Sequence, residues 1–207
     1  MLKGVSQRRT KIFILPLFDM KRFSLWFAAL AVSFLTIGLP TLSSAQVAYT
    51  ISDESTVVVN GASNKSDWSV KAELVEGTVE LADGVPTSAQ FTIAVANLKS
   101  GRSLIMDRLM RGAFEADENP SIDFVMTSAA ASEGDAFDIE GDLTMAGVTN
   151  PVSIRLTRTQ DAAGKYTFTG QSDLNMRDYE MDPPSAMFGA LLTKPEVVIQ
   201  FAIKLTS

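Results

Sequence analysis

The chain contains 207 residues, with neither cysteine nor histidine, and carries a formal net charge of −6. Its length predicts a single domain, and the two missing residue types exclude the usual nucleophile–base pairs, CxxC redox pairs, disulfides and nearly all zinc or iron sites. The acidic balance argues against nucleic acid or an anionic membrane surface as a direct partner, because both are polyanions.

The N-terminal part of the chain has the pattern of a cleavable export signal. Residues 21–22 are basic, 23–39 are mainly apolar and 43–45 are small, which is the order of the three regions of a signal peptide. Met20 opens this pattern, so we expect translation to start there and the mature chain to start at Gln46. An uncleaved membrane anchor is the alternative, because the apolar run is about long enough to span a bilayer.

The predicted organisation is an N-terminal extension with a signal peptide over residues 1–45 and one folded domain over residues 46–207. Without the first part the chain keeps 12 basic and 23 acidic residues, a net charge of −11. Because this domain has no cysteine to carry a lipid anchor, we expect a soluble periplasmic protein with no stable membrane insertion. The expected oligomeric state is a monomer or a homodimer.

From Ala48 onward apolar and polar residues alternate with period two, which predicts strands with one buried and one solvated face. The clearest alternation covers residues 68–74, 89–95, 122–126, 137–139, 152–156, 166–168 and 197–205. Turn-forming residues punctuate the chain at 60–61, 83–84, 133–134, 147, 163–164 and 182–184. About eight strands with short connections predict an all-β fold. An antiparallel up-and-down barrel is favoured over a sandwich because closure removes exposed edges.

Two segments interrupt the strand pattern. Residues 103–112 contain two apolar pairs at i, i+4 spacing and end in glycine, which predicts one short helix. Residues 176–194 place methionine, leucine and phenylalanine around two prolines and are expected to fold back on the domain. Because flexible thioethers adapt to ligands of different shape, the methionines of both segments predict an adaptable mouth. Gap-filling in a core is the alternative.

The compact acidic group around Tyr179 is the one site where carboxylate chemistry is conceivable. Asp178, Glu180 and Asp182 alternate with their neighbours, as acids on a solvated face also do. The oxygen-rich, glycine-containing loop of an EF-hand is missing, and a glycosidase pair would need convergent carboxylates in a cleft. We therefore predict a non-enzymatic protein with no catalytic residues, no metal and no cofactor, and keep an acid-only hydrolase as an alternative.

Three motifs follow one another in the middle of the chain. They are Met106-Asp107-Arg108-Leu109-Met110, then Asn119-Pro120-Ser121-Ile122-Asp123-Phe124, then the run GDLTMAGVTNPV over residues 141–152. Followed by Asp182-Pro183-Pro184 and a closing strand, they resemble the YceI-like family over roughly Ala48 to Leu205. That family carries an R-D-x-H-L-like turn, a P-x-I-x-F strand and a G-D-L-T-x-x-G-V-T-x-x-V strand-turn-strand. The first motif is matched loosely, with Asp107 kept, and the other two are matched closely.

The resemblance implies a periplasmic, lipocalin-like barrel that binds a polyisoprenoid lipid, such as an isoprenoid quinone, in an apolar interior. Many relatives have an S-N-x-H-D-W pattern, and residues 63–68 of this chain have serine in place of its histidine. Asn64 and Trp68 are then left to supply polar and stacking contacts. The departure leaves open that the chain binds a different lipid, or none.

The predicted ligand-binding residues form the apolar lining and mouth of the barrel. An eight-stranded barrel is just wide enough for its own side chains or one slim ligand. The predicted residues are Trp68, Phe91, Ile93, Val95, Leu109, Met110, Phe124, Met126, Ile139, Leu143, Ile154, Phe168, Met187 and Phe188. The competing hypothesis is a filled, ligand-free barrel that acts through its acidic exterior as a stress or interaction protein.

Overall fold

The computed structural model describes residues 45–73, 75–186 and 188–206. These residues belong to one compact unit. The expected extension and signal peptide lie, apart from residue 45, outside the described residues, so their boundary stays a prediction. Within the described part no helix has both the length and the apolar character needed to cross a bilayer.

Strands dominate the described residues. They are β1 (Gln46–Ile51), β2 (Thr56–Ser63), β3 (Asp67–Ala72), β4 (Glu76–Ala82), β5 (Val85–Ala94), β6 (Leu98–Lys99), β7 (Ser121–Ala131), β8 (Ala136–Met145), β9 (Val148–Gln160), β10 (Tyr166–Asn175), β11 (Ser185–Ala186) and β12 (Leu191–Thr206). The helical elements are α1 (Leu104–Ala113) and two short 3₁₀ helices, η1 (Val95–Asn97) and η2 (Met176–Tyr179).

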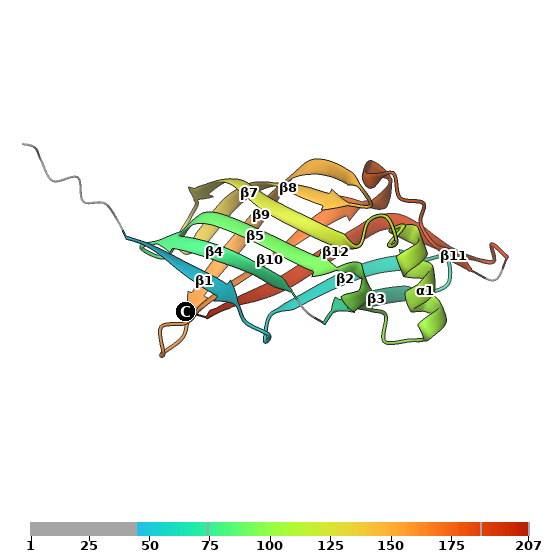
Figure 1. Cartoon of the computed structure of the whole chain (residues 1–207), viewed down its shortest axis with the longest axis horizontal. Coiled ribbons are helices and arrows are strands. Elements are labelled where there is room, and N and C mark those ends of the chain that lie inside the picture. The colour runs from blue at the N-terminus through green and yellow to red at the C-terminus, as the bar shows by residue number, and fades with distance from the viewer. Residues whose placement is uncertain (1–44, 74, 187, 207) are drawn as a thin grey trace, which may run out of the picture. The chain divides into compact units, whose positions relative to one another are not determined.

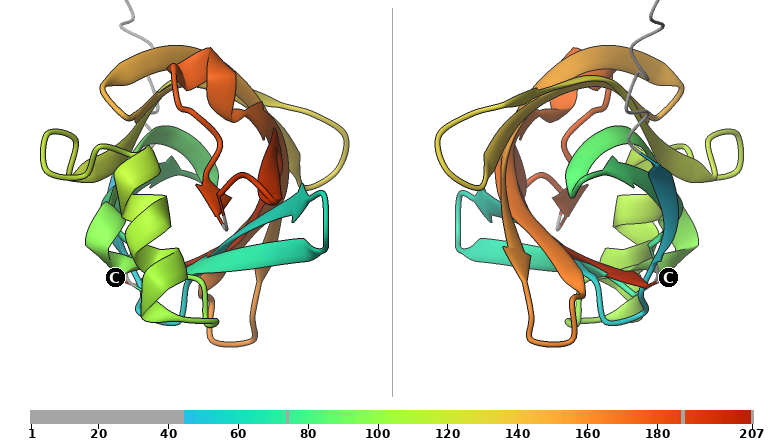
Figure 2. Two further views of the ribbon diagram at one scale, coloured as in Figure 1. Left: turned by 90° about the vertical axis from the view of Figure 1, so that its right-hand side faces the viewer. Right: turned by 90° about the vertical axis from the view of Figure 1, so that its left-hand side faces the viewer.

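Eight strands close into an antiparallel barrel in the order β1-β4-β5-β7-β8-β9-β10-β12. The ring is completed where β1 pairs with β12, through Thr50 opposite Thr206 and Ile51 opposite Leu205. Figure 2 shows the barrel from its two ends. The predicted closed barrel with one short helix is confirmed, and closure leaves these eight strands without a free edge.

The first three strands of the barrel are each broken in the middle, after Ile51, Ala72 and Ala94. The halves outside the barrel ring are β2, β3 and β6. They continue the same sheet, in which β12 pairs with β2, β2 with β3 and β3 with β6. Buried Ser55 fixes the first break, because its Oγ donates to Lys204 O and accepts from Lys204 N. One end of the barrel is therefore formed by β2, β3 and β6, with α1 beside them (Figure 1).

Helix α1 begins and ends close to the predicted limits. Ser103 is its N-cap and accepts a hydrogen bond from Met106 N, which satisfies one of the free N–H groups of the first turn. The helix passes Gly112, the predicted stop, and ends at Ala113. It is fastened from inside by Asp107, which is buried and accepts hydrogen bonds from Ser100 N at 2.9 Å and Ser100 Oγ at 2.6 Å.

One predicted turn is wrong, and its residues lie inside a strand. Asn60 and Gly61 belong to β2, where Gly61 pairs with Trp68 of β3. A Cβ atom at Gly61 would lie 2.2 Å from Trp68 Cζ2, so the glycine provides space for the indole ring instead of bending the chain. The turn predicted at 83–84 is confirmed, since Asp83 and Gly84 both have positive φ between β4 and β5.

Candidate functional site: an apolar cavity in the barrel

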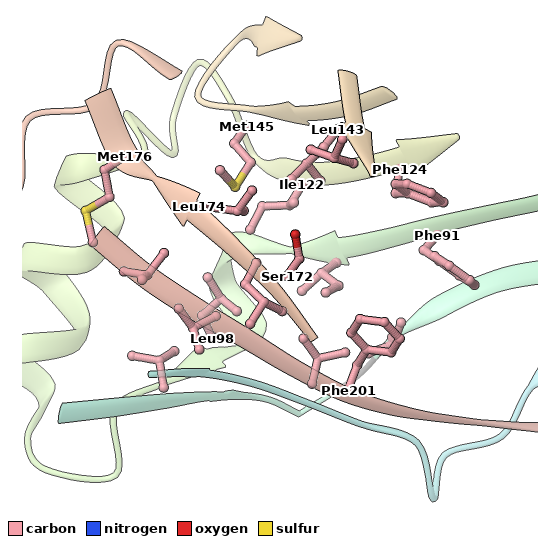
Figure 3. A pocket seen from close by; sticks show the side chains of 18 of the residues that line it. Phe91, Leu98, Ile122, Phe124, Leu143, Met145, Ser172, Leu174, Met176 and Phe201 are labelled. Atoms are coloured by element: carbon pink, nitrogen blue, oxygen red, sulfur yellow. The ribbon is translucent and has the colours of Figure 1, made fainter. Parts of the chain in front are cut away.

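A cavity of about 260 Å³ lies inside the barrel. Its lining comes from α1 at one end and from most of the strands, and includes Pro86 near the start of β5 and Phe168 near the start of β10. Figure 3 shows the side chains that surround its middle part, from Phe91 and Phe124 to Met176. The space is continuous with the core, whose buried residues line the same inner face of the sheet.

The lining is apolar almost everywhere. Its polar members are Ser69, Ser100, Arg102, Ser172 and Thr193. Arg102 is exposed and its Nη2 donates to Asp67 O at 2.7 Å, while Ser100 is engaged with Asp107. Ser172 is different, because its hydroxyl points into the cavity among Leu174, Ile122 and Phe201 (Figure 3). A charged head group has no partner in the middle of this cavity.

Three aromatic rings lie close to glycines of a neighbouring strand. A Cβ atom at Gly141 would lie 2.4 Å from the Phe124 ring, and one at Gly170 would lie 2.7 Å from Phe201 Cζ. Trp68 covers Gly61 in the same way. Each ring therefore packs beside a position in the sheet that has no side chain.

Phe124 also stacks on Phe91, with ring centroids 5.6 Å apart and ring planes 16° from parallel. The pair links β5 to β7, where the two residues are directly opposite in the sheet. Offset aromatic pairs of this kind are favourable beyond their buried area. The wall on this side of the cavity is thus rigid and wholly apolar.

Methionines of both segments that were predicted to form a mouth lie at the end of the cavity beside α1. Met106 and Met110 come from α1, and Met176 and Met181 from the segment between β10 and β11. That segment folds back on the domain as expected, since Met181 and Tyr179 are buried in a cluster with Met145.

Eleven of the fourteen predicted residues line the cavity. They are Trp68, Phe91, Ile93, Leu109, Met110, Phe124, Met126, Ile139, Leu143, Ile154 and Phe168. The structure therefore brings together residues from seven different elements. The nine from strands follow the inward phase of the alternation, and Leu109 and Met110 come from α1.

The other three predicted residues do not contribute to the cavity as described. Val95 is fully buried but lies in η1, where the break after β5 takes it out of the strand alternation, so it is not a lining residue. Phe188 is fully exposed in the turn between β11 and β12, with a φ of 54°. Met187 lies outside the described residues.

Sequence reasoning missed a large part of the wall. The missed residues include Val57 and Val59 of β2, Leu98 of β6, Phe114 after α1, and Ile199, Phe201 and Ile203 of β12. A usable signal existed in β12, because the alternation over 197–205 has the same phase as its inward side chains. Leu98 and Phe114 carry no such signal, since they follow breaks in the regular elements.

Two acids of the group around Tyr179 line a second, polar pocket: Glu180 and Asp182 lie there with Glu115, whereas Asp178 does not line it. Asp178, Glu180 and Asp182 are exposed, while Tyr179 between them is buried. Burial raises the pKa of the Tyr179 hydroxyl, and the neighbouring Asp178 carboxylate adds to this shift. Across the described residues no group of acidic side chains is arranged to hold a metal ion.

Solved structures share the fold of this barrel. BcnA of Burkholderia cenocepacia has a TM-score of 0.67 at 22% identity, covering 75% of this chain and 99% of that one. A polyisoprenoid-binding domain of Saccharophagus degradans, implicated in plant cell wall breakdown, has a TM-score of 0.63 at 16% identity, covering 77% and 98%. A YceI protein of Campylobacter jejuni has a TM-score of 0.57 at 13% identity, covering 67% and 84%.

At these identities the likeness establishes the fold alone, and no curated protein matches the sequence significantly. The family assignment comes from a sequence model. The YceI-like domain model matches residues 46–205, which include every strand of the closed barrel. The chain therefore belongs to the YceI-like domain family.

Proposed function

We propose that this protein binds a polyisoprenoid lipid in the barrel cavity and carries it, without a chemical step, in the periplasm. The observation that supports the proposal most directly is the cavity itself, an apolar space inside a closed barrel with no charged residue in its middle. Membership of the YceI-like family and the polyisoprenoid-binding neighbour from Saccharophagus degradans support the same ligand class.

An isoprenoid chain suits this lining on energetic grounds. Each buried methylene group contributes about 0.8 kcal/mol, so a five-carbon isoprene unit contributes roughly 4 kcal/mol before the costs of ordering the chain. A few such units outweigh the loss of translational and rotational freedom on binding. Methionine side chains at the mouth can adjust to the branched methyl groups of the chain as it enters.

Sequestration is the mechanism that fits the residue inventory. The sequence has no histidine and no cysteine for covalent or general-base chemistry of the common kinds, and the acids near Tyr179 are exposed and do not line the apolar cavity. The N-terminal signal pattern supports export of the carrier. A filled barrel acting through its acidic exterior would lack the open apolar cavity, so we do not adopt it.

The first test is to identify what the protein carries. The full chain is expressed with its N-terminal segment, purified gently, and analysed by native mass spectrometry followed by solvent extraction of bound lipid. A co-purifying prenyl lipid is the expected result. An apo protein that also fails to take up prenyl quinones would overturn the proposal, and the observed mass would report where the N-terminal segment is cleaved.

Binding can also be followed directly, because Trp68 is the only tryptophan after residue 45 and lines the cavity. Prenyl quinones are expected to quench its fluorescence. Ser172→Phe would place a ring in the middle of the cavity and should abolish quenching. The matched control is Gln171→Phe, which places the same ring at the neighbouring, exposed position of β10 and should bind normally.

A further inference from the structure

Three segments at the α1 end of the barrel are joined into one surface by hydrogen bonds. The Arg102 side chain, which precedes α1, donates to Asp67 O at the start of β3. Asn64 of the β2–β3 turn donates from Nδ2 to Ala190 O at 3.1 Å and accepts at Oδ1 from Leu192 N at 3.0 Å. We call residues 64–67, 102–108 and 188–192 together the mouth face. Figures 1 and 2 place all three at the same end of the barrel.

Large apolar side chains are concentrated on the mouth face. Seven such residues are exposed in the described part of the chain, and four of them belong to this face. They are Leu104 at 80%, Ile105 at 68%, Leu192 at 52% and Phe188 at 112% of full exposure. Helix α1 is thus apolar on two sides. Met106, Leu109 and Met110 line the cavity, while Leu104 and Ile105 face solvent.

The mouth face is also basic, in a domain that is otherwise strongly acidic. Lys65, Arg102 and Arg108 are exposed, and no ion pair between described residues engages any of them. The acids of the face are Asp67, which is exposed, and Asp107, which is buried and hydrogen-bonded to Ser100. The exposed cations therefore outnumber the exposed acids here, whereas residues 46–207 carry 12 basic against 23 acidic residues.

We propose that the mouth face docks reversibly on a membrane surface that contains anionic phospholipids. Exposed leucine, isoleucine and phenylalanine side chains beside arginine and lysine are the composition that binds the headgroup region of a bilayer. Phe188 and Leu104 enter the interface while Arg102, Arg108 and Lys65 lie near lipid phosphates. The acidic remainder of the barrel is repelled, so the surface charge selects the orientation in which this face meets the membrane.

Docking in this orientation places the end of the cavity formed by α1 and the β2–β3 turn against the bilayer. A water-insoluble ligand then passes between membrane and cavity without crossing water. The inference extends the proposed function, but it concerns an interaction surface that exists with or without a ligand.

The test is co-sedimentation of residues 46–207 with vesicles of phosphatidylcholine and a minority of phosphatidylglycerol. The barrel alone is used because the apolar run at 23–39 would itself bind lipid. The solved BcnA chain, 99% of which is covered by this domain, indicates that the barrel folds without it. Binding that is stronger with phosphatidylglycerol and weakens with salt is expected.

The triple variant L104S/I105S/F188S should lower vesicle binding by about tenfold or more, since three apolar side chains leave the interface. The double variant K65E/R108E should remove the preference for phosphatidylglycerol. V47S/V85S/V125S is the matched control. It changes the three exposed apolar residues outside the mouth face and should leave binding unchanged.

Equal loss of binding in the control, or no binding by the original sequence, would overturn the proposal. Sedimentation velocity on the same variants tests whether the mouth face binds a second copy of the chain instead of a membrane. If L104S/I105S/F188S dissociates a dimer while vesicles stay unbound, the mouth face contacts a second copy of the chain, and membrane docking is wrong. Quenching of Trp68 by a prenyl quinone in detergent tests ligand binding independently, so failure of docking and failure of the carrier function are distinguishable.

Discussion

Ser172 is the residue that can distinguish a functionalised lipid from a plain hydrocarbon. Its Oγ faces the cavity and has no hydrogen-bond partner among the described residues. An unpaired hydroxyl in an apolar wall is unfavourable until water or a ligand oxygen satisfies it. Ser172 lies opposite Ile199 in the sheet, so a ligand oxygen that bonds to its hydroxyl would lie well inside the barrel.

We predict that Ser172→Ala weakens binding of a prenyl quinone or prenyl alcohol by about 1 kcal/mol, roughly fivefold, through the lost hydrogen bond. Binding of a saturated hydrocarbon of similar length should not change. Titration of Trp68 fluorescence measures both affinities. Ser172→Thr keeps the hydroxyl and serves as control. Equal weakening for both ligands would mean that Ser172 acts through packing and not through its hydroxyl.

Gly61 does not line the cavity, but it leaves the space that the ring of Trp68, a lining residue, occupies. The atoms nearest to an added Cβ are all in the Trp68 ring, at 2.2 to 2.7 Å. We predict that Gly61→Ala pushes the indole toward the cavity, costs about 1–3 kcal/mol by overpacking and weakens ligand binding. Chemical denaturation and the Trp68 emission maximum measure the two effects.

The control for this prediction is Gly112→Ala. Nothing lies within 4 Å of a Cβ atom there, and the position is an exposed one in α1. This change should stabilise the helix slightly, by up to about 1 kcal/mol, because alanine has the higher helix propensity. An unchanged Trp68 spectrum in Gly61→Ala would show that the ring does not depend on the glycine.

At single residues the sequence predicted side-chain direction wherever a strand is unbroken. Phe124 and Ile139 line the cavity because they lie within the regularly alternating stretches 122–126 and 137–139, the first of which ends before the register shift after Met126. Val95 does not, since it follows a break that alternation cannot reveal. The pairing of Gly170 with Phe201 was also beyond prediction, because it joins two strands whose neighbourhood only the fold determines.

At the scale of elements, the sequence predicted α1 within one residue at each end, because a capping serine and paired apolar residues are local signals. It did not predict that β1 and β2 are halves of one broken strand. The break depends on Ser55 and on backbone groups of β12, about 150 residues away, so no local pattern encodes it.

Helix α1 is held against the barrel by the Asp107 carboxylate, and this attachment should depend on pH. Hydrogen bonds from the side chain and backbone of Ser100 lower the pKa of Asp107. The folded protein thus prefers the charged form. The resulting stability is present above the unfolded value of about 3.9 and is lost as the pH falls below it, through the lower folded pKa.

We predict that Asp107→Asn lowers the thermal midpoint above about pH 4 and that its difference from the original sequence shrinks at lower pH. Hydrogen exchange of α1 amides should show the same trend. Ser100→Ala removes the same side-chain bond from the donor side and should reduce the pH dependence in parallel. A difference that stays constant down to strongly acidic pH would assign the effect to packing.

At the scale of the molecule, the α1 end of the cavity and the exposed cations of the mouth face lie at the same end of the barrel. Residues 46–207 carry more acidic than basic residues, and the exposed cations and apolar side chains of the mouth face lie at the end where α1 meets the cavity. The net negative charge of the domain favours solubility and repels an anionic membrane, whereas the mouth face attracts it. A carrier needs both properties, because it must leave the membrane as readily as it approaches.

An open apolar cavity also has a thermodynamic consequence for the whole barrel. Empty space in a core forfeits dispersion contacts, so the ligand-free protein is less stable than the occupied one. A ligand that binds only the folded state stabilises it by about 2.7 kcal/mol when its concentration is 100 times Kd. For a domain of this size each kcal/mol raises Tm by about 2–4 °C. We therefore predict an increase of roughly 5–10 °C with saturating prenyl quinone, measured by calorimetry.

Ser172→Phe supplies the internal comparison for this prediction. Its added ring occupies the centre of the cavity, so its Tm should no longer respond to prenyl quinone, while Gln171→Phe on the outer face should respond as fully as the original sequence. An equal Tm increase in Ser172→Phe would place the ligand outside the barrel, because a ligand cannot stabilise the fold from a cavity that the added ring already fills.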